Sequence, residues 1–179
     1  TFNDGSSFLG DLSINGATLN LEGGLTVSNL TVTENATINI DTLGSLSTGD
    51  TLSVDNLVMN GGNFKTISGS TGSNTPAGVW SIGSTQTATL TDGTQVTLNG
   101  LTVNNAGVVN QSLTANDVRL NNGTVFNNLS SGVWDFQTDT GVTRTSGVGT
   151  LINSGDLVKS AGTLSPINVV FNNTGGNIF

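Results

Sequence analysis

The sequence of 179 residues contains no cysteine, no histidine and only two prolines. The lack of cysteine excludes a disulfide scaffold and thiol catalysis. The lack of histidine as well excludes the usual zinc sites and histidine-based general-base chemistry. We therefore expect no cofactor, apart from calcium held by acidic oxygens as the one option that composition leaves open.

Charge is also scarce, since charged residues make up 9% of the chain and the net charge is −8. The four basic residues are scattered and form no cluster, which argues against nucleic acid and anionic membranes as partners. No apolar run approaches the roughly 20 residues of a membrane span, so we expect no membrane insertion. No signal peptide is visible, and we interpret the chain as mature or a fragment.

The residues that are abundant indicate an ordered β protein. Gly, Asn, Thr and Ser dominate, but Val, Leu and Ile recur throughout at strand spacing, and disordered chains lack such positions. No window keeps the i, i+3, i+4, i+7 apolar spacing of a helix. The sequence therefore predicts an all-β fold of short, frequent strands.

Five segments share a nine-residue pattern in which positions 1, 3, 6 and 8 are apolar or small and the others are almost all polar or Gly. This alternation has period two, so each half is a short strand. Two outward residues in succession, at positions 4 and 5, predict a corner that keeps the same face inward. A series of such corners around one core is typical of a β-solenoid. The segments are Leu12–Asn20, Leu25–Thr33, Leu52–Asn60, Val96–Asn104 and Leu113–Asn121.

A two-residue hairpin is the alternative to a corner, because Asn-Gly favours a type I′ turn. Two segments hold Asn-Gly at positions 4 and 5, but the other three hold Ser-Asn, Asp-Asn and Asn-Asp. A type I′ turn needs positive φ twice, whereas a single left-handed corner accepts Asn or Asp more readily. We favour corners, formed by Asn15, Gly16, Asn29, Asp55, Asn56, Asn99, Gly100, Asn116 and Asp117.

The fold expected is thus a single-stranded, right-handed parallel β-helix with irregular coils and protruding loops, one segment over residues 1–179. A longer module occurs twice, at about 52–87 and 113–140, and each copy contains a Gly-Val-Trp. The first copy carries an additional stretch, Ser68–Ala77, which we interpret as a solvent loop. Phe-Asn pairs at residues 2, 126 and 171 indicate the same phase of a repeat. We therefore expect a section of a longer stack, or a unit that stacks end to end.

The carboxylates are the first candidates for chemistry. A polysaccharide lyase or hydrolase on this scaffold requires several of them on one face, and no motif spacing links them here. We interpret them mainly as turn residues and solvated charges, with calcium binding through their oxygens as the alternative. The candidates are Asp11, Asp55, Asp92, Asp117, Asp135, Asp139 and Asp156.

Aromatic and hydroxyl side chains supply two further candidates. Trp80 and Trp134 recur in similar contexts, either as a platform for sugar rings or as core-filling side chains. Thr-x-Thr triplets occur at 31–33 and between 85 and 91. A flat threonine array can bind ice, but it requires threonine at one phase of consecutive coils, and these triplets are unevenly placed.

Several segments resemble the repeats of large bacterial secreted and surface proteins, namely residues 149–163, Val170–Gly175 and the Gly-Val-Trp units. They are similar to filamentous-haemagglutinin-type and autotransporter-type adhesins, whose passengers are right-handed parallel β-helices. The resemblance implies export, a secreted or cell-surface location, and a stalk or adhesive role. The partners implied are host or cell-surface glycans or proteins, or copies of the chain itself. No active-site motif carries over.

We therefore expect a non-enzymatic structural or adhesive segment of an extracellular bacterial protein. One alternative is a polysaccharide-binding or polysaccharide-degrading β-helix, either a lyase or a tailspike-like enzyme, which requires a carboxylate cluster on one face. The other alternative is a subunit of a self-assembling extracellular filament, which the repeat phases at the two ends suggest.

Overall fold

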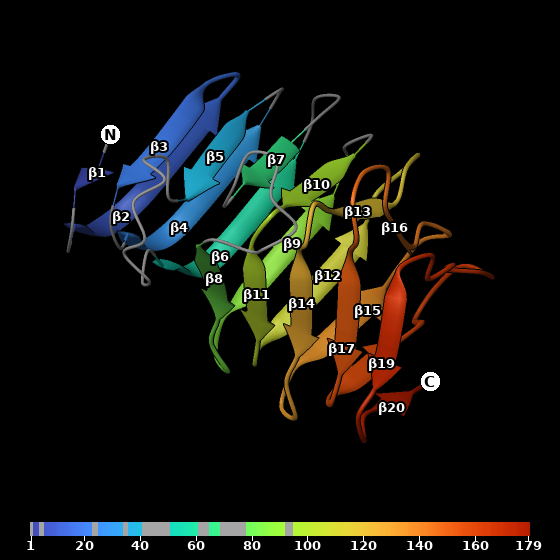
Figure 1. Ribbon diagram of the computed structural model, residues 1–179. Helices are drawn as coiled ribbons and strands as arrows, with labels where there is room; N and C mark the ends of the chain where they lie inside the picture. Colours follow the sequence, from blue (N-terminus) through green and yellow to red (C-terminus); the bar gives the residue numbers. More distant parts are fainter. Residues whose placement is uncertain are drawn as a thin grey trace.

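The computed structural model describes residues 2–3, 6–22, 25–33, 36–40, 51–60, 65–68, 78–91 and 95–179. These residues form strands and turns and no helix, and all their strand pairs are parallel (Figure 1). The predicted β-solenoid is thus confirmed. Because it contains no helix, this part of the chain provides no helical membrane span.

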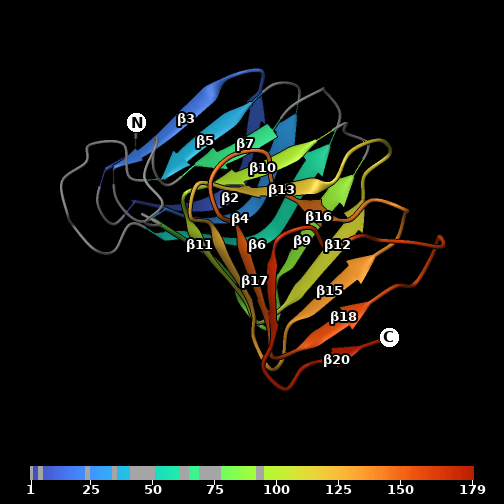
Figure 2. The same ribbon diagram turned by 45° about the vertical axis from the view of Figure 1, so that its right-hand side comes forward.

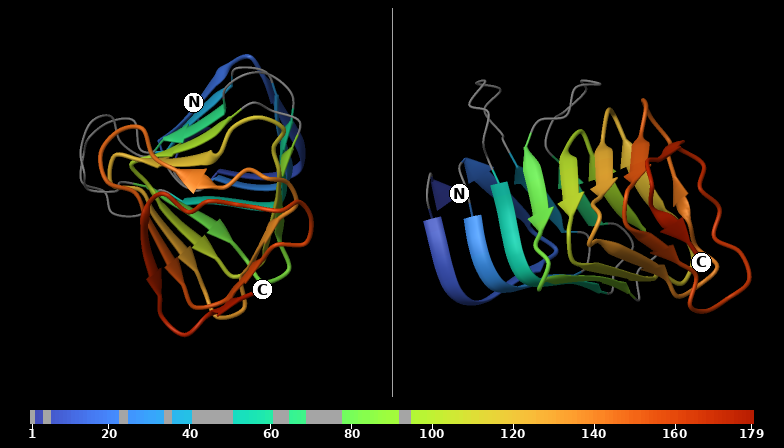
Figure 3. Two further views of the ribbon diagram at one scale, coloured as in Figure 1. Left: turned by 90° about the vertical axis from the view of Figure 1, so that its right-hand side faces the viewer. Right: turned by 90° about the horizontal axis from the view of Figure 1, so that it is seen from below.

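The stacked strands form three faces, which we call A, B and C (Figure 3). Face A consists of β1 (Phe2–Asn3), β3 (Thr18–Glu22), β5 (Thr37–Ile40), β7 (Lys65–Ser68), β10 (Val96–Asn99), β13 (Val118–Asn121) and β16 (Val142–Thr143). Face B holds β8 (Val79–Ile82), β11 (Thr102–Asn105), β14 (Val125–Asn128), β17 (Thr150–Asn153) and β19 (Val170–Asn173). Face C holds β9 (Thr87–Thr91), β12 (Val108–Ser112), β15 (Val133–Phe136), β18 (Asp156–Val158) and β20 (Asn177–Ile178).

Three long strands, β2 (Ser6–Asn15), β4 (Leu25–Thr33) and β6 (Thr51–Asn60), each cross faces B and C without interruption. Residues 51–53 of β6 pair with β8 on face B, and residues 56–59 pair with β9 on face C. The ladder between β4 and β6 omits one residue pair, Ser28 and Asp55, at the point between these two stretches. The chain therefore bends inside a single strand here, as the curved ribbons of Figure 2 show.

All five nine-residue segments bend between faces, and none forms a hairpin. At Asn15-Gly16 the chain passes from β2 to β3, and at Asn99-Gly100 from β10 to β11, and in neither case do the two strands pair with each other. Gly16 and Gly100 both have positive φ, 57° and 64°. The hairpin alternative is therefore wrong, because the flanking strands pair in parallel with strands of neighbouring coils and not with each other.

The five segments do not occupy one repeating position in the stack. Two of them turn from face C to face A, at Asn15-Gly16 and at Asn116-Asp117. Two bend from face B to face C, at Asn29 and at Asp55-Asn56. The fifth turns from face A to face B at Asn99-Gly100. The pattern specifies a corner of any kind, because every corner requires the same break in alternation.

The two longer modules begin on different faces of the solenoid, because the corners in their sequences can lie between any two faces. Trp80 lies on face B, opposite Leu52 and Val103, whereas Trp134 lies on face C, opposite Val109 and Leu157. The modules at 52–87 and 113–140 are therefore similar in sequence but not equivalent in the stack. Of the additional stretch Ser68–Ala77, Ser68 ends β7 and residues 69–77 lie outside the described part.

The core follows from alternation within each strand. On face B its inward column passes through Trp80, Val103, Phe126, Leu151 and Phe171. The predicted equivalence of the Phe-Asn pairs at 126 and 171 holds, but the pair at residues 2 and 3 lies on face A. Full burial of one such side chain contributes about 1.5–3 kcal/mol to folding.

Candidate functional site

A ladder of buried asparagines follows the corner between faces B and C in the later coils. The Nδ2 of Asn105 donates to the Oδ1 of Asn128 at 2.8 Å, Asn128 donates to Asn153 at 2.8 Å, and Asn153 donates to Asn173 at 2.9 Å. The first three residues are 0%, 1% and 0% exposed. Such a ladder satisfies the amides along the stack, and without these partners each buried amide would be destabilising.

The ladder residues also bind backbone groups, mainly those of the next coil. The second Nδ2 hydrogen of Asn105 reaches the carbonyl of Val133, and that of Asn128 reaches the carbonyl of Asp156. The oxygen of Asn105 additionally accepts the backbone N–H of Gly107 at 3.1 Å. The ladder therefore fixes the distance between coils and the shape of each turn at the same time.

A column of glycines lies beside the ladder, because the coils approach too closely there for any side chain. A Cβ at Gly107, Gly132, Gly155 or Gly176 would overlap atoms of the preceding coil. For Gly132, the nearest atom of the preceding coil is the carbonyl oxygen of Asn105, and the side-chain oxygen of Asn128 in its own coil is also too close. The recurrent Asn and Gly of these corners thus have separate physical roles.

Both tryptophans fill the core and offer no face to a sugar ring. Trp80 is 1% exposed and Trp134 is 0% exposed. Their neighbours Val79 and Val133 point outward instead, as the alternation requires. The interpretation as a carbohydrate platform is therefore wrong for these two residues.

The two indoles differ in how their N–H groups are satisfied. Trp134 donates to the Oε1 of the buried Gln111 at 3.0 Å, and Gln111 in turn donates to the hydroxyl of Thr140 and to the carbonyl of Gly141. Trp134 also stacks with Phe136, with ring centroids 5.4 Å apart and an interplanar angle of 10°. Among the residues that the structure describes, the buried Nε1 of Trp80 has no hydrogen-bond partner.

The carboxylates among the described residues lie apart or hold the backbone. Asp11 accepts from Asn29 at 2.6 Å, Asp117 accepts from the N–H of Gly141 at 2.6 Å, and Asp156 accepts from Asn177 at 2.8 Å. Asp92 and the side chain of Asp55 lie outside what the structure describes. Within its described part, no three acidic side chains gather into a set that could hold a metal ion. The geometry thus offers calcium no multidentate site there.

Asp135 and Asp139 hold the exposed turn of residues 160–164 in place. Asp135 accepts from the N–H and the hydroxyl of Ser160, at 3.2 and 2.9 Å. Asp139 accepts from the backbone N–H groups of Thr163 and Leu164, and these bonds are the main reason that its pKa lies below the usual value. Lys159 forms an ion pair with Asp139 at 3.6 Å, which lowers the pKa further. These oxygens are therefore occupied by structural hydrogen bonds.

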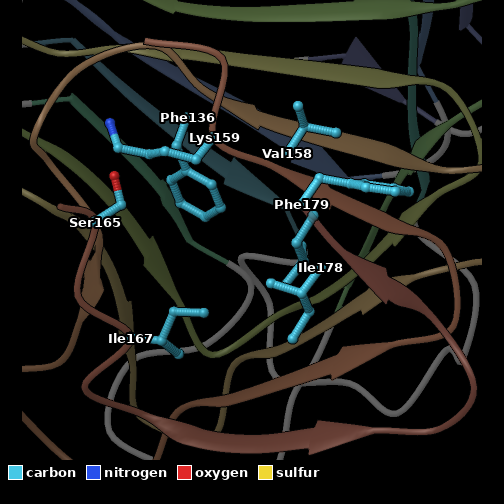
Figure 4. A pocket seen from close by; sticks show the side chains of 8 residues that line it. Phe136, Val158, Lys159, Ser165, Ile167, Ile178 and Phe179 are labelled. Atoms are coloured by element: carbon cyan, nitrogen blue, oxygen red, sulfur yellow. The ribbon is translucent and has the colours of Figure 1, made fainter. Parts of the chain in front are cut away.

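A small cavity of about 90 Å³ lies near the C-terminal strands (Figure 4). Its lining is mostly apolar, with Lys159 and Ser165 as the polar members. Ligand pockets usually enclose about 300–1,000 Å³, so this cavity is too small for a typical small-molecule site. The apolar lining residues are Phe136, Leu157, Val158, Ile167, Ile178 and Phe179.

The Thr-x-Thr triplets of the sequence do not build a column. Thr87, Thr89 and Thr91 all lie along the single strand β9, and the neighbours of Thr89 in register are Val58 and Asn110. This confirms that these triplets are unevenly placed with respect to the coils.

A regular threonine column exists elsewhere, on face A, and the sequence reasoning missed it. Thr18, Thr37, Thr66 and Thr97 are consecutive register partners on β3, β5, β7 and β10. Each belongs to a short motif, Thr followed by Leu or Ile and then by Asn or Ser. This motif was a usable signal, but its copies lie 19, 29 and 31 residues apart, and only the fold shows that they are neighbours.

No protein family, curated protein or solved structure matches this chain. The geometry by itself defines the class of protein, which is a three-faced parallel β-solenoid with an internal asparagine ladder.

Proposed function

We propose that this chain is a non-enzymatic structural segment of an extracellular or cell-surface bacterial protein, serving as a stiff stalk. The observation that carries the proposal is the continuous hydrogen-bonded stack. Parallel ladders link β2 to β20, and buried asparagines link the later coils at one corner. An interior that is hydrogen-bonded from coil to coil resists bending, because bending separates rungs whose partners are buried.

The resemblance of several segments to the repeats of bacterial adhesins supports the extracellular location. The chain is poor in charge and rich in Asn, Gly, Ser and Thr. The carboxylates described above accept hydrogen bonds from the backbone or from polar side chains, and no three acidic side chains gather there, so the residues that the structure describes supply no candidate catalytic cluster. In this proposal, recognition of host or cell-surface glycans or proteins belongs to loops that leave the coils.

The absence of native cysteine makes stiffness directly measurable. Asn15→Cys and Thr114→Cys place spin labels at two exposed positions on the same corner, between faces C and A. Pulsed electron resonance on the doubly labelled chain is expected to give one narrow distance distribution. A second labelled pair, Thr114→Cys with Ser160→Cys, measures the same kind of distance across the later coils at that corner. Broad distributions for both pairs would contradict a stalk.

The enzymatic alternative has a separate test. The purified chain is incubated with a panel of neutral and acidic polysaccharides, and reducing ends and unsaturated products are measured. We expect neither to rise above background. Product formation that disappears in Asp135→Asn or Asp139→Asn would overturn the proposal in favour of a carbohydrate-active β-helix.

A further inference from the structure

We propose that face A carries an ice-binding surface, formed where Thr18, Thr37, Thr66 and Thr97 stand in register on consecutive strands. Neighbouring strands of a sheet are about 4.8 Å apart, so the threonines repeat at that interval along the solenoid axis. Parallel strand pairing holds the interval constant from β3 to β10. The column therefore has the regularity that a crystalline partner requires.

A second column runs beside the first and makes the array two-dimensional. Asn20, Asn39, Ser68 and Asn99 are also consecutive register partners, two residues beyond each threonine. Two residues of a parallel strand span about 6.6 Å, which sets the distance between the columns. Ice presents oxygen atoms in rows whose repeats lie close to these two spacings. Figures 1 and 2 show that β3, β5, β7 and β10 run in similar directions, so the array is not strongly twisted.

The threonines that the structure describes fully are available to solvent. Thr18 is exposed, and Thr37 and Thr97 are partly exposed. The hydroxyl of Thr97 accepts a hydrogen bond from Gln95 at 2.8 Å. A threonine hydroxyl both donates and accepts, as a water molecule in ice does, and the adjacent methyl group orders water around it.

The chemistry of the array favours ice over a polysaccharide or a charged partner. The eight positions of the two columns carry Thr, Asn or Ser and no charge. They also contain no aromatic ring, and both tryptophans of the chain are buried elsewhere. Sugar rings are bound mainly by aromatic stacking, which this array cannot provide.

Face C has no comparable column. The register column that contains Thr89 continues through Val58, Asn110 and Asp135, so the regular threonines are specific to face A.

Arg119 ends the column and supplies a sharp test. It is the register partner of Thr97 on one side and of Thr143 on the other. Arg119→Thr would join the column of Thr18, Thr37, Thr66 and Thr97 to Thr143 and lengthen the array. Arg119→Gln is the matched control, because it removes the same charge without restoring a threonine.

The experiment measures inhibition of ice recrystallisation and uptake of the labelled chain into a growing ice hemisphere. We expect the unaltered chain to be active and Thr37→Tyr or Thr97→Tyr to need an about tenfold higher concentration, as loss of a central recognition group does. Thr89→Tyr on face C is the control and should leave the activity unchanged. Circular dichroism and melting temperature show whether each variant is folded.

Arg119→Thr is expected to lower the active concentration, and Arg119→Gln is not. An inactive unaltered chain, or equal losses in Thr97→Tyr and Thr89→Tyr, would overturn the proposal. A third result would also overturn it. If the unaltered chain sediments with neutral polysaccharide particles and Thr37→Tyr does not, the array binds sugar. The stalk proposal is judged by distance distributions and is unaffected by these outcomes.

Discussion

The side-chain Nδ2 of Asn128 lies 2.8 Å from the side-chain Oδ1 of Asn153, which is 25 residues further along the chain. Both amides are buried, and both also bond to the amide of the adjacent rung. One interaction thus links two coils at a point where the backbone leaves the regular ladders. Its strength is testable because the outward neighbour, Asn127, forms a comparable bond to Asn104 on the surface.

Asn128→Ala should lower the free energy of unfolding by about 2–4 kcal/mol. The change leaves the Nδ2 of Asn105 and the Oδ1 of Asn153 without their buried partners. Asn127→Ala removes one partly exposed bond, and should cost at most about 1 kcal/mol. Urea unfolding followed by tryptophan fluorescence measures both. Equal effects would show that the buried ladder adds nothing beyond an ordinary surface pair.

The two tryptophans should respond differently to the same substitution. Trp134→Phe leaves the buried Oε1 of Gln111 without its donor, whereas Trp80→Phe removes an N–H that has no partner among the described residues. The loss of ring volume is the same, so the difference in unfolding free energy reports the hydrogen bond together with the stacking of Trp134 on Phe136. We expect Trp134→Phe to be more destabilising by about 1–2 kcal/mol. A larger effect at Trp80 would contradict this assignment.

Gly132→Ala should destabilise the chain by more than about 2 kcal/mol, because the added Cβ would overlap the backbone of Asn105. Gly83→Ala is the control at the corresponding corner of an earlier coil, where the Cβ meets only the flexible side chain of Gln86, at 3.3 Å. Thermal melting of the two variants is sufficient for the comparison. If Gly132→Ala melts as the unaltered chain does, the coils are less closely packed than described.

The turn held by Asp139 should loosen in acid. The pKa of Asp139 is lowered from 3.8, chiefly by the backbone N–H groups of Leu164 and Thr163. A lowered pKa means that the stabilisation is complete above the unfolded value and is lost as the pH falls through the folded value. Amide hydrogen exchange at Thr163 and Leu164 should therefore be slower in the unaltered chain than in Asp139→Asn at about pH 7. The two should converge at about pH 2, and a difference that persists there would assign the protection to another group.

The fold was predictable because each solenoid corner interrupts the alternation of inward and outward residues in the local sequence. Two outward residues in succession, as in Asn15-Gly16 and Asn99-Gly100, break the alternation wherever the chain turns. The face on which a corner lies was not predictable, because all three corners require the same local break. Trp80 and Trp134 show this, because their sequence contexts are similar although one lies on face B and the other on face C.

The candidate surfaces were less predictable, because they depend on register between distant coils. The burial of both tryptophans follows from alternation only after the inward face is known. The threonine column at Thr18, Thr37 and Thr97 comes from motifs at unequal separations. Local sequence therefore shows the corners, and only strand pairing shows which side chains become neighbours.

The corner beside the asparagine ladder varies in length while the stack continues unchanged. Two residues separate β11 from β12 and β17 from β18, three separate β19 from β20, and four separate β14 from β15. The asparagine before each gap and the glycine at its end keep their contacts in every case. Insertions and deletions can therefore accumulate at this edge of the molecule without shifting any strand. It is the natural place at which to graft a foreign peptide, with the rungs on either side acting as a fixed frame.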